Sequence, residues 1–304
     1  MLDIPDSVKS IGAGVFRNCI GLVVMDVPNG VQAIEDYVFS GCIGLTEIAL
    51  PDSVIAIGDE AFYGCSGLLD IELPVDLISI GKSAFVSCSG LTSIRIPDKV
   101  SSIGTYAFGG CSGLSSAYVT DLTIWCGISF GDSQSNPLYY AKELYVDGEL
   151  VTNLVIPAGV MEIGAFAFSN YSRLTNVELP EGLNSIGVSA FYGCTSLEQI
   201  RIPDSVRSIG AYAFFGCAAL NEISIPSGVT QIGGHTFSEC TGLTTIVIPK
   251  SVISIGYCAF SDCPGLTDVY YSGTQDEWKA IEIEYGNETL RYTATVHYPS
   301  DQVE

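Results

Sequence analysis

Basic residues are scarce in this chain: 12 lysines and arginines stand against 34 aspartates and glutamates in 304 residues, for a formal net charge of −22. Nucleic-acid binding needs clustered Lys and Arg to neutralise phosphates, so this balance excludes a nucleic-acid partner and disfavours anionic membrane surfaces. Long apolar runs are also missing, because turn residues interrupt every hydrophobic segment before the ~18 residues of a membrane-spanning helix. We therefore predict no membrane insertion.

Groups suited to catalysis are equally few. Histidine occurs only at His235 and His297, and neither lies beside a serine or cysteine motif. The sequence contains no nucleophile elbow and no phosphate-binding loop. Acidic pairs such as Asp70 and Glu72 could be assembled for glycoside hydrolysis, yet any acidic β-face offers such pairs. We predict that the chain is not an enzyme.

Metal-binding patterns are absent from the sequence as well. There is no Cys-x-x-Cys pair, and the acidic residues do not follow the spacing of a calcium loop. Acidic residues instead occur at turn positions, where they keep a regular structure soluble. The sequence therefore predicts no cofactor and no metal site.

Proline, in contrast, recurs with a fixed interval of 23 residues in two groups. A period of this size predicts a solenoid, in which each repeat contacts only its neighbours. The stack then presents one long surface that suits the binding of a large partner. The prolines are Pro5, Pro28, Pro51, Pro74 and Pro97, followed by Pro157, Pro180, Pro203, Pro226 and Pro249.

The repeats follow the pattern L-x-x-I-x-I-P-x-x-V-x-x-I-G-x-x-A-F-x-x-C, which is complete between Leu91 and Cys111. The Ile-x-Ile alternation predicts a strand with both side chains in the core, and proline ends that strand. We expect the Val-x-x-Ile segment to return across the opposite face. The glycine is expected to permit the backbone angle of the next corner, and phenylalanine fills the interior. The predicted fold class is a repeat solenoid.

This unit resembles the BspA-like branch of the leucine-rich repeat proteins, which share the Ile-Pro, Ile-Gly, Ala-Phe and Cys positions of the same pattern. The resemblance covers nearly the whole chain. It implies a right-handed superhelix with a parallel β-sheet on the concave face and short strands or helical turns on the convex face. Members are typically found on, or secreted from, bacteria, and several are implicated in adhesion to host proteins. The resemblance thus implies an extracellular or cell-surface location.

The repeats are interrupted between Pro97 and Pro157, an interval that is not a multiple of 23. Asp121 is suited to cap a short helix through Trp125, and Asp147-Gly148 predicts a hairpin turn between residues 142–146 and 149–156. The start of the chain falls inside a repeat, which suggests a removed leader or a longer array. We predict four segments: repeats in 1–120, an inserted module in 121–150, repeats in 151–270, and a cap in 271–304.

The C-terminal segment repeats part of this module, since the residues around Trp278 parallel those around Trp125. Pro5 and Pro157 are 152 residues apart, and the two tryptophans 153, so the chain is an approximate tandem. We expect one continuous stack, with both tryptophans covering the apolar end of a repeat run. The alternative role is an aromatic platform for a sugar or peptide, which requires an exposed ring.

Nine of the eleven cysteines occupy one repeat position, 23 residues apart within each group. A column of this kind favours free thiols that pack as small hydrophobic residues, with an occasional rung-to-rung disulfide as the alternative. Cys126 and Cys258 lie off the column and are candidates for reactive thiols.

The positions between the inward residues of each strand are candidates for ligand binding. From this row we select Glu72, Arg95, Tyr118, Glu178, Arg201 and Tyr270, because arginine and tyrosine dominate binding hot spots. The innermost row is chemically varied while the core columns are nearly uniform. It comprises Asp3, Asp26, Ala49, Glu72, Arg95, Tyr118, Val155, Glu178, Arg201, Ser224, Val247 and Tyr270.

Three functions fit this sequence. The first is an adhesin-like binding module that recognises a protein ligand, such as a host extracellular-matrix or mucosal protein, through the concave face. The second is a structural spacer or surface-layer element without a ligand on that face. The third is carbohydrate binding through an exposed Trp125 or Trp278.

Overall fold

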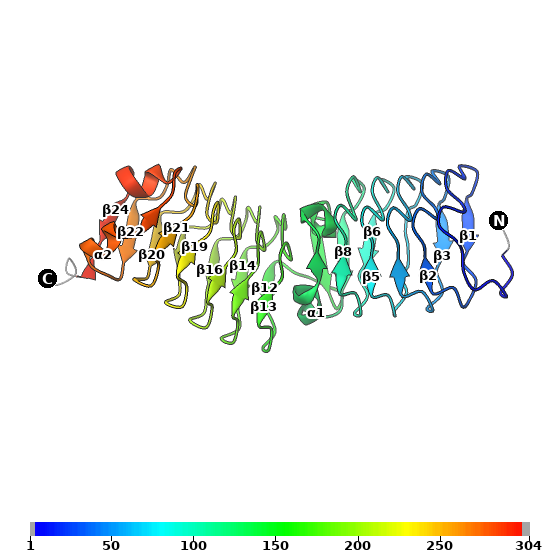
Figure 1. Cartoon of the computed structure of the whole chain (residues 1–304), viewed down its shortest axis with the longest axis horizontal. Helices are drawn as coiled ribbons and strands as arrows, with labels where there is room; N and C mark the ends of the chain where they lie inside the picture. Colours follow the sequence, from blue (N-terminus) through cyan, green and yellow to red (C-terminus); the bar gives the residue numbers. More distant parts are fainter. Residues whose placement is uncertain (1–3, 300–304) are drawn as a thin grey trace. The chain divides into compact units, whose positions relative to one another are not determined.

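The computed structural model describes residues 4–299, so Asp3 and the ends of the first and last predicted segments lie outside the described residues. The chain divides into two compact units, Met1–Val151 (unit 1) and Thr152–Glu304 (unit 2). Each unit is a stack of similar turns, or rungs, with short parallel strands running across it (Figure 1). The predicted solenoid is confirmed, and the boundaries of the four predicted segments stay a prediction.

The strand before each proline forms what we call the front sheet, the sheet expected on the concave side. Its strands pair in parallel and join the same position of successive repeats, as in Ser93 with Ser116. In unit 1 its strands are β1 (Val24–Asp26), β3 (Glu47–Ala49), β6 (Ser93–Arg95), β8 (Ser116–Val119) and β10 (Glu143–Val146). In unit 2 they are β12 (Asn153–Val155), β14 (Asn176–Glu178), β16 (Gln199–Arg201), β18 (Glu222–Ser224), β20 (Thr245–Ile248), β22 (Asp268–Tyr271) and β24 (Thr295–His297). These strands form two paired groups, β12-β14-β16 and β18-β20-β22-β24.

Within residues 4–299, one expected strand of the front sheet is not formed. Residues 68–74 have no strand, so the sheet of unit 1 is interrupted between β3 and β6. Glu47 and Asp70 occupy the same position in adjacent rungs, and like charges directly opposite one another weaken strand pairing. The expectation of a strand at Asp70–Glu72 was therefore wrong, although Ile71 between them is buried as predicted.

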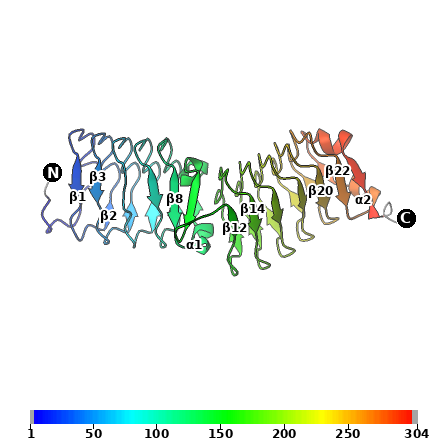
Figure 2. The same cartoon turned by 180° about the vertical axis from the view of Figure 1, so that it is seen from behind.

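The Val-x-x-Ile segments return as two-residue parallel strands, which we call the back sheet (its strand β2 is labelled in Figure 2). This confirms the short strands expected on that side. Unit 1 contributes β2 (Ala33–Ile34), β4 (Ala56–Ile57), β5 (Ser79–Ile80), β7 (Ser102–Ile103) and β9 (Ser129–Phe130). Unit 2 contributes β13 (Glu162–Ile163), β15 (Ser185–Ile186), β17 (Ser208–Ile209), β19 (Gln231–Ile232), β21 (Ser254–Ile255) and β23 (Glu282–Ile283). These strands form one five-stranded sheet in unit 1 and two three-stranded sheets, β13-β15-β17 and β19-β21-β23, in unit 2.

The core between the sheets is built from columns of identical residues. Phenylalanines of successive rungs stack face to face, with ring centroids 5.2 Å apart for Phe62 and Phe85 and 5.5 Å for Phe191 and Phe214. The isoleucines and leucines of the repeat are almost completely buried beside them.

All eleven cysteines are free thiols, as the sequence favoured. Cys126 is buried, and burial raises its pKa to about 12, so its predicted reactivity was wrong.

The repeat glycine has a different role from the predicted one. No Ile-Gly glycine from Gly58 onward has a positive φ, whereas a Cβ at Gly81 would lie 2.5 Å from the carbonyl carbon of Gly58. Glycine is required there because the backbones of adjacent rungs approach closely. The left-handed backbone occurs instead at the residue before the repeat cysteine and at the residue before the alanine position, and we call the second of these the corner column. Its members are Tyr37, Glu60, Ser83, Tyr106, Phe166, Ser189, Tyr212, His235 and Cys258.

The interruption after Thr120 forms the last rung of unit 1. Asp121 caps α1 (Leu122–Gly127) by accepting a hydrogen bond from the Thr123 amide, as predicted. The chain then adds β9 to the back sheet, passes through the 3-10 helices η1 (Ser133–Ser135) and η2 (Pro137–Tyr139), and adds β10 to the front sheet. The predicted hairpin pairs β10 with β11 (Glu149–Leu150), and the chain then enters unit 2.

Unit 2 ends with a rung of the same kind. Thr274 and Glu277 form a reciprocal capping box at the start of α2 (Gln275–Lys279), and the Thr274 amide lowers the pKa of Glu277. β23 extends the back sheet, and after the π-helix η3 (Thr289–Thr293) the strand β24 extends the front sheet. Both tryptophan modules thus supply a terminal rung that carries a helix.

Candidate functional site

The candidate site is the outward surface of the front sheet. Along most of its strands a buried residue alternates with two outward neighbours, as in β16, where Ile200 is buried between Gln199 and Arg201. Of the six selected residues, Glu72, Arg95, Glu178 and Arg201 are exposed, while Tyr118 and Tyr270 are half-buried. All six therefore lie where the repeat pattern places them, on the solvent side of this sheet.

Three of these residues meet in unit 1. Glu72, Arg95 and Tyr118 line a hollow of about 470 Å³ on the front sheet. Asp98 and Thr120 form its edge and are joined by a hydrogen bond from the Thr120 hydroxyl to the Asp98 carboxylate. The hollow combines an aromatic ring, a guanidinium and carboxylates, which can engage both polar and apolar groups of a ligand.

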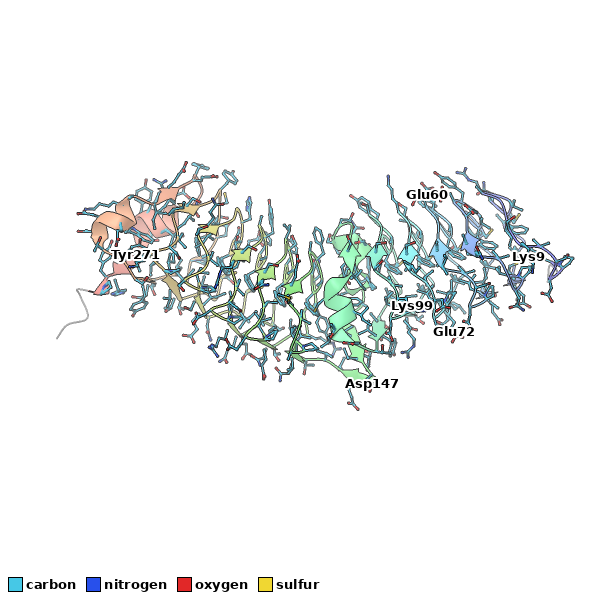
Figure 3. All side chains as sticks on the ribbon, turned by 60° about the horizontal axis from the view of Figure 1, so that its bottom comes forward. Lys9, Glu60, Glu72, Lys99, Asp147 and Tyr271 are labelled. Atoms are coloured by element: carbon cyan, nitrogen blue, oxygen red, sulfur yellow. The ribbon has the colours of Figure 1, made fainter. Side chains whose placement is uncertain are left out.

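A second hollow of about 570 Å³ borders the first and is acidic. Glu47, Asp52, Asp70 and Glu72 all contribute to its lining, and no basic residue does. It lies where the front sheet lacks its expected strand. In Figure 3 the labelled Glu72 and Lys99 lie on one side of unit 1 and Glu60, of the corner column, on the other. The hollows and the corner column are thus separate surfaces.

Arg95 belongs to a ladder of stacked side chains. Its guanidinium carbon lies 5.3 Å from the centre of the Tyr118 ring, and that ring stacks on Tyr145 with centroids 4.8 Å apart. Tyr145 is paired with Tyr118 in the register of β8 and β10. The sequence did not predict Tyr145 in this row. The offset between the two halves of the tandem was the signal that could have identified it.

In unit 2, Glu178 and Arg201 line a hollow of about 370 Å³ together with Glu181 and Glu222. Arg201 forms an ion pair with Glu181, with 3.3 Å between Nη1 and Oε1. Both side chains are more than two thirds exposed, so this pair contributes little to stability and leaves the arginine available.

Tyr270 lies apart from that hollow and stacks on His297, with ring centroids 4.6 Å apart. His297 Nε2 lies 2.6 Å from Asp268 Oδ1, and Asp268 also accepts a hydrogen bond from Thr267. The contact with His297, followed by that with Thr267, lowers the pKa of Asp268. His297 continues the front row in β24 and was missed for the same reason as Tyr145.

The two tryptophans have different environments. Trp125 is completely buried and meets Phe130 edge to face, so its ring cannot form a sugar platform. Trp278 is half-buried and packs edge to face against Tyr271. Covering of the core is thus the role of Trp125, while Trp278 keeps part of its ring accessible.

Residues 4–299 contain neither a candidate metal cluster nor a candidate membrane-spanning helix. In this part of the chain, no group of three or more His, Cys, Asp or Glu side chains has a metal-binding arrangement. The helices described there are too short or too polar to span a membrane.

Comparison with known families connects this geometry to other proteins. A family model described as the BspA type leucine rich repeat region matches residues 1–115 and 142–267. The chain belongs to the BspA-type leucine-rich repeat family. The matched residues include the repeats of both units, and the residues between them contain most of the terminal rung of unit 1. No curated protein sequence gives a match.

Solved structures of bacterial leucine-rich repeat proteins are similar to this BspA-type chain. One, from Bacteroides ovatus, is 27% identical with a TM-score of 0.52, covering 97% of this chain and 82% of that chain. A leucine-rich cell surface protein from Faecalibacterium prausnitzii is 29% identical with a TM-score of 0.57, covering 92% and 73%. The pneumococcal vaccine antigen PcpA shares the fold at 21% identity, with a TM-score of 0.60 and coverage of 90% and 79%.

Proposed function

We propose that this BspA-type protein is a secreted or cell-surface binding module that recognises a host or neighbouring-cell protein through its front sheet. The observation that carries this proposal is the hollow formed by Glu72, Arg95 and Tyr118. Arginine and tyrosine are the residues most enriched at binding hot spots, and here they are held side by side on strands over a rigid core.

The charges of the front surface also indicate which groups of a partner it can bind. The acidic hollow beside Arg95 favours a basic segment of a protein ligand, while Arg95 and Arg201 themselves suit carboxylates. Binding energy would then be spread over several rungs, and no catalytic step is needed. The surface location rests on the family and on a similar protein described as a cell surface protein.

The test is binding of the purified chain to an array of extracellular-matrix proteins, mucins and glycans at physiological salt. The decisive variant is Arg95→Glu/Arg201→Glu, which reverses both front-sheet arginines. Its matched control is Lys82→Glu/Arg207→Glu, which makes the same charge change next to back-sheet strands. We expect a protein ligand whose binding is lost in the first variant and kept in the second.

Other outcomes favour the alternatives. A glycan that binds regardless of the front-sheet variant directs attention to Trp278, whose ring is partly accessible. Equal loss in both variants would indicate a general effect of negative charge and would contradict a front-sheet site. No binding to any array member would favour the spacer function. Circular dichroism of each variant establishes that the fold is intact.

A further inference from the structure

A second candidate surface lies at the corner of unit 2, away from the front sheet. Four rings from successive rungs meet there: Tyr212, His235, Tyr257 and Tyr285, which we call the aromatic strip. Their centroids are 4.6 Å apart for Tyr212 and His235, 5.4 Å for His235 and Tyr257, and 6.1 Å for Tyr257 and Tyr285. The strip is therefore a continuous surface of aromatic rings.

These rings remain accessible to solvent. Tyr212 is 37% exposed, Tyr257 48% and Tyr285 74%. Contiguous exposed aromatic surface on a soluble protein marks an interaction site more often than a chance arrangement. Tyr212 and His235 also have φ values of 59° and 56°, a left-handed backbone that bulky residues rarely adopt. The fold thus holds these two rings at the surface despite a backbone cost.

A tyrosine of unit 1 shows which kind of group packs on such a ring in this fold. The guanidinium carbon of Arg17 lies 5.2 Å from the centre of the Tyr37 ring. Tyr37 occupies the same repeat position as Tyr212, so one of the two corner tyrosines of unit 1, Tyr37 and Tyr106, already has a cation over it. Among residues 152–299, no described lysine or arginine lies over Tyr212, Tyr257 or Tyr285.

The charge around the strip favours the same kind of ligand. Glu284 and Glu288 lie near Tyr285 in the sequence, and unit 2 belongs to a chain with a formal net charge of −22. The Arg291 guanidinium also lies nearby, where it donates a hydrogen bond to the Ile283 carbonyl. The pKa of Tyr257 is raised first by its hydrogen bond with Cys258, and the carboxylate of Glu288 adds to this effect. Carboxylates beside exposed ring faces attract cations and disfavour anionic ligands.

We propose that the aromatic strip binds arginine side chains of a cationic protein segment, independently of the front sheet. Guanidinium groups stack on aromatic rings and are less strongly hydrated than ammonium groups, so arginine is favoured over lysine. The nearby carboxylates then balance the charge of the bound segment.

The experiment uses the full chain and a fluorescent peptide of four arginines separated by glycines, with binding measured by fluorescence anisotropy. The same peptide with citrulline in place of arginine is the uncharged comparison. The strip variant is Tyr212→Asn/Tyr257→Ser/Tyr285→Ser, in which asparagine suits the left-handed position. We expect the strip variant to bind the arginine peptide about tenfold more weakly, and the citrulline peptide to bind weakly to both proteins.

A matched control comes from unit 1. Tyr106→Asn/Tyr63→Ser removes Tyr106 of the corner column and Tyr63, which lies outside that column. They are 47% and 42% exposed, and Tyr106 has the same φ as Tyr212. No ring among the described residues contacts either of them, so we expect unchanged affinity. Tyr257→Phe/Tyr285→Phe keeps both ring faces and should also keep binding.

Several results would overturn the proposal. The strip variant would bind the arginine peptide as well as the parent if general charge attraction were sufficient. Equal weakening in the unit 1 control, or loss in the phenylalanine variant, would equally contradict a cation on the ring faces. If only the strip variant lost binding to a glycan while it still bound the peptide, the ligand of the strip would be that glycan and not arginine. The Arg95→Glu/Arg201→Glu variant must bind the arginine peptide at least as strongly as the parent does. This result would show that the peptide does not need the front-sheet arginines.

Discussion

The thiol of Cys65 donates a hydrogen bond to the carbonyl oxygen of Phe39, across 3.1 Å, from one rung of the stack to the preceding one. The same bond joins Cys88 to the Phe62 carbonyl at 3.1 Å. The cysteine column therefore does more than fill space, because each thiol also connects adjacent rungs through a buried polar group.

Replacing Cys88 by alanine should lower the free energy of unfolding by about 1–2 kcal/mol, since it removes this hydrogen bond and the contacts of a buried sulfur. The Phe62 carbonyl keeps its bond from the Cys65 amide, which limits the loss. Urea denaturation followed by circular dichroism measures the effect. Cys19→Ala, at a half-buried thiol of the same column, is the control and should cost less. Equal costs would mean that the hydrogen bond contributes nothing.

Stability should fall at alkaline pH. Burial raises the pKa of Cys65, Cys111 and Cys263 to about 12, from an ordinary value of 9.0. Between these values the unfolded chain loses thiol protons that the folded chain keeps. The stabilisation is therefore complete below pH 9 and declines toward pH 12, by about 1.4 kcal/mol per pH unit for each thiol.

The measurement is the urea midpoint at a series of pH values from neutral to strongly alkaline. The triple variant Cys65→Ser/Cys111→Ser/Cys263→Ser should show a shallower decline, because serine does not ionise in this range. A decline of the same slope in both proteins would assign it to other groups, such as tyrosines.

The close approach of adjacent rungs predicts a strong effect at Gly81. A Cβ added there would lie 2.5 Å from the Gly58 carbonyl carbon and 2.7 Å from the Asp59 amide nitrogen. Because these are backbone atoms, Gly81→Ala should destabilise unit 1 by about 1–3 kcal/mol. Gly21→Ala is the control, since no atom lies within 4 Å of its added Cβ. Thermal unfolding compares them, and similar shifts would contradict the steric explanation.

The sequence was sufficient for the repeat register. The regular recurrence of proline places Ser93 beside Ser116 and Asn176 beside Gln199, and these pairs are found in the structure. The core columns follow from the same spacing, because a side chain that points inward in one rung does so in the next. The outward positions of Arg95 and Arg201 could be assigned for this reason alone.

The terminal rungs were harder to predict. Tyr145 follows Tyr118, and His297 follows Tyr270, at an interval longer than the proline period, because a helix replaces part of each rung. A frame based on the proline period therefore stops before these strands. The aromatic strip was also hidden, since its rings come from different repeat positions and only the folded backbone brings them into contact.

The role of glycine was misassigned because sequence alone does not separate two reasons for its presence. Ile-Gly suggested a special backbone angle, but the constraint comes from the neighbouring rung. At the corner column, in contrast, residues as different as Glu60, Ser83 and Tyr106 all adopt the left-handed conformation. The angle there is imposed by hydrogen bonds between rungs, as when the Glu60 amide donates to the Lys82 carbonyl at 2.8 Å.

At the corner column, the backbone conformation therefore does not depend on which side chain is present. Glutamate, serine, tyrosine, phenylalanine, histidine and cysteine all occupy it without altering the spacing of the rungs. A lineage of such proteins can therefore acquire new corner chemistry by single substitutions, and a protein engineer can do the same. The corner residue of each rung can then be substituted separately to change which ligand the surface binds, while the core residues stay the same.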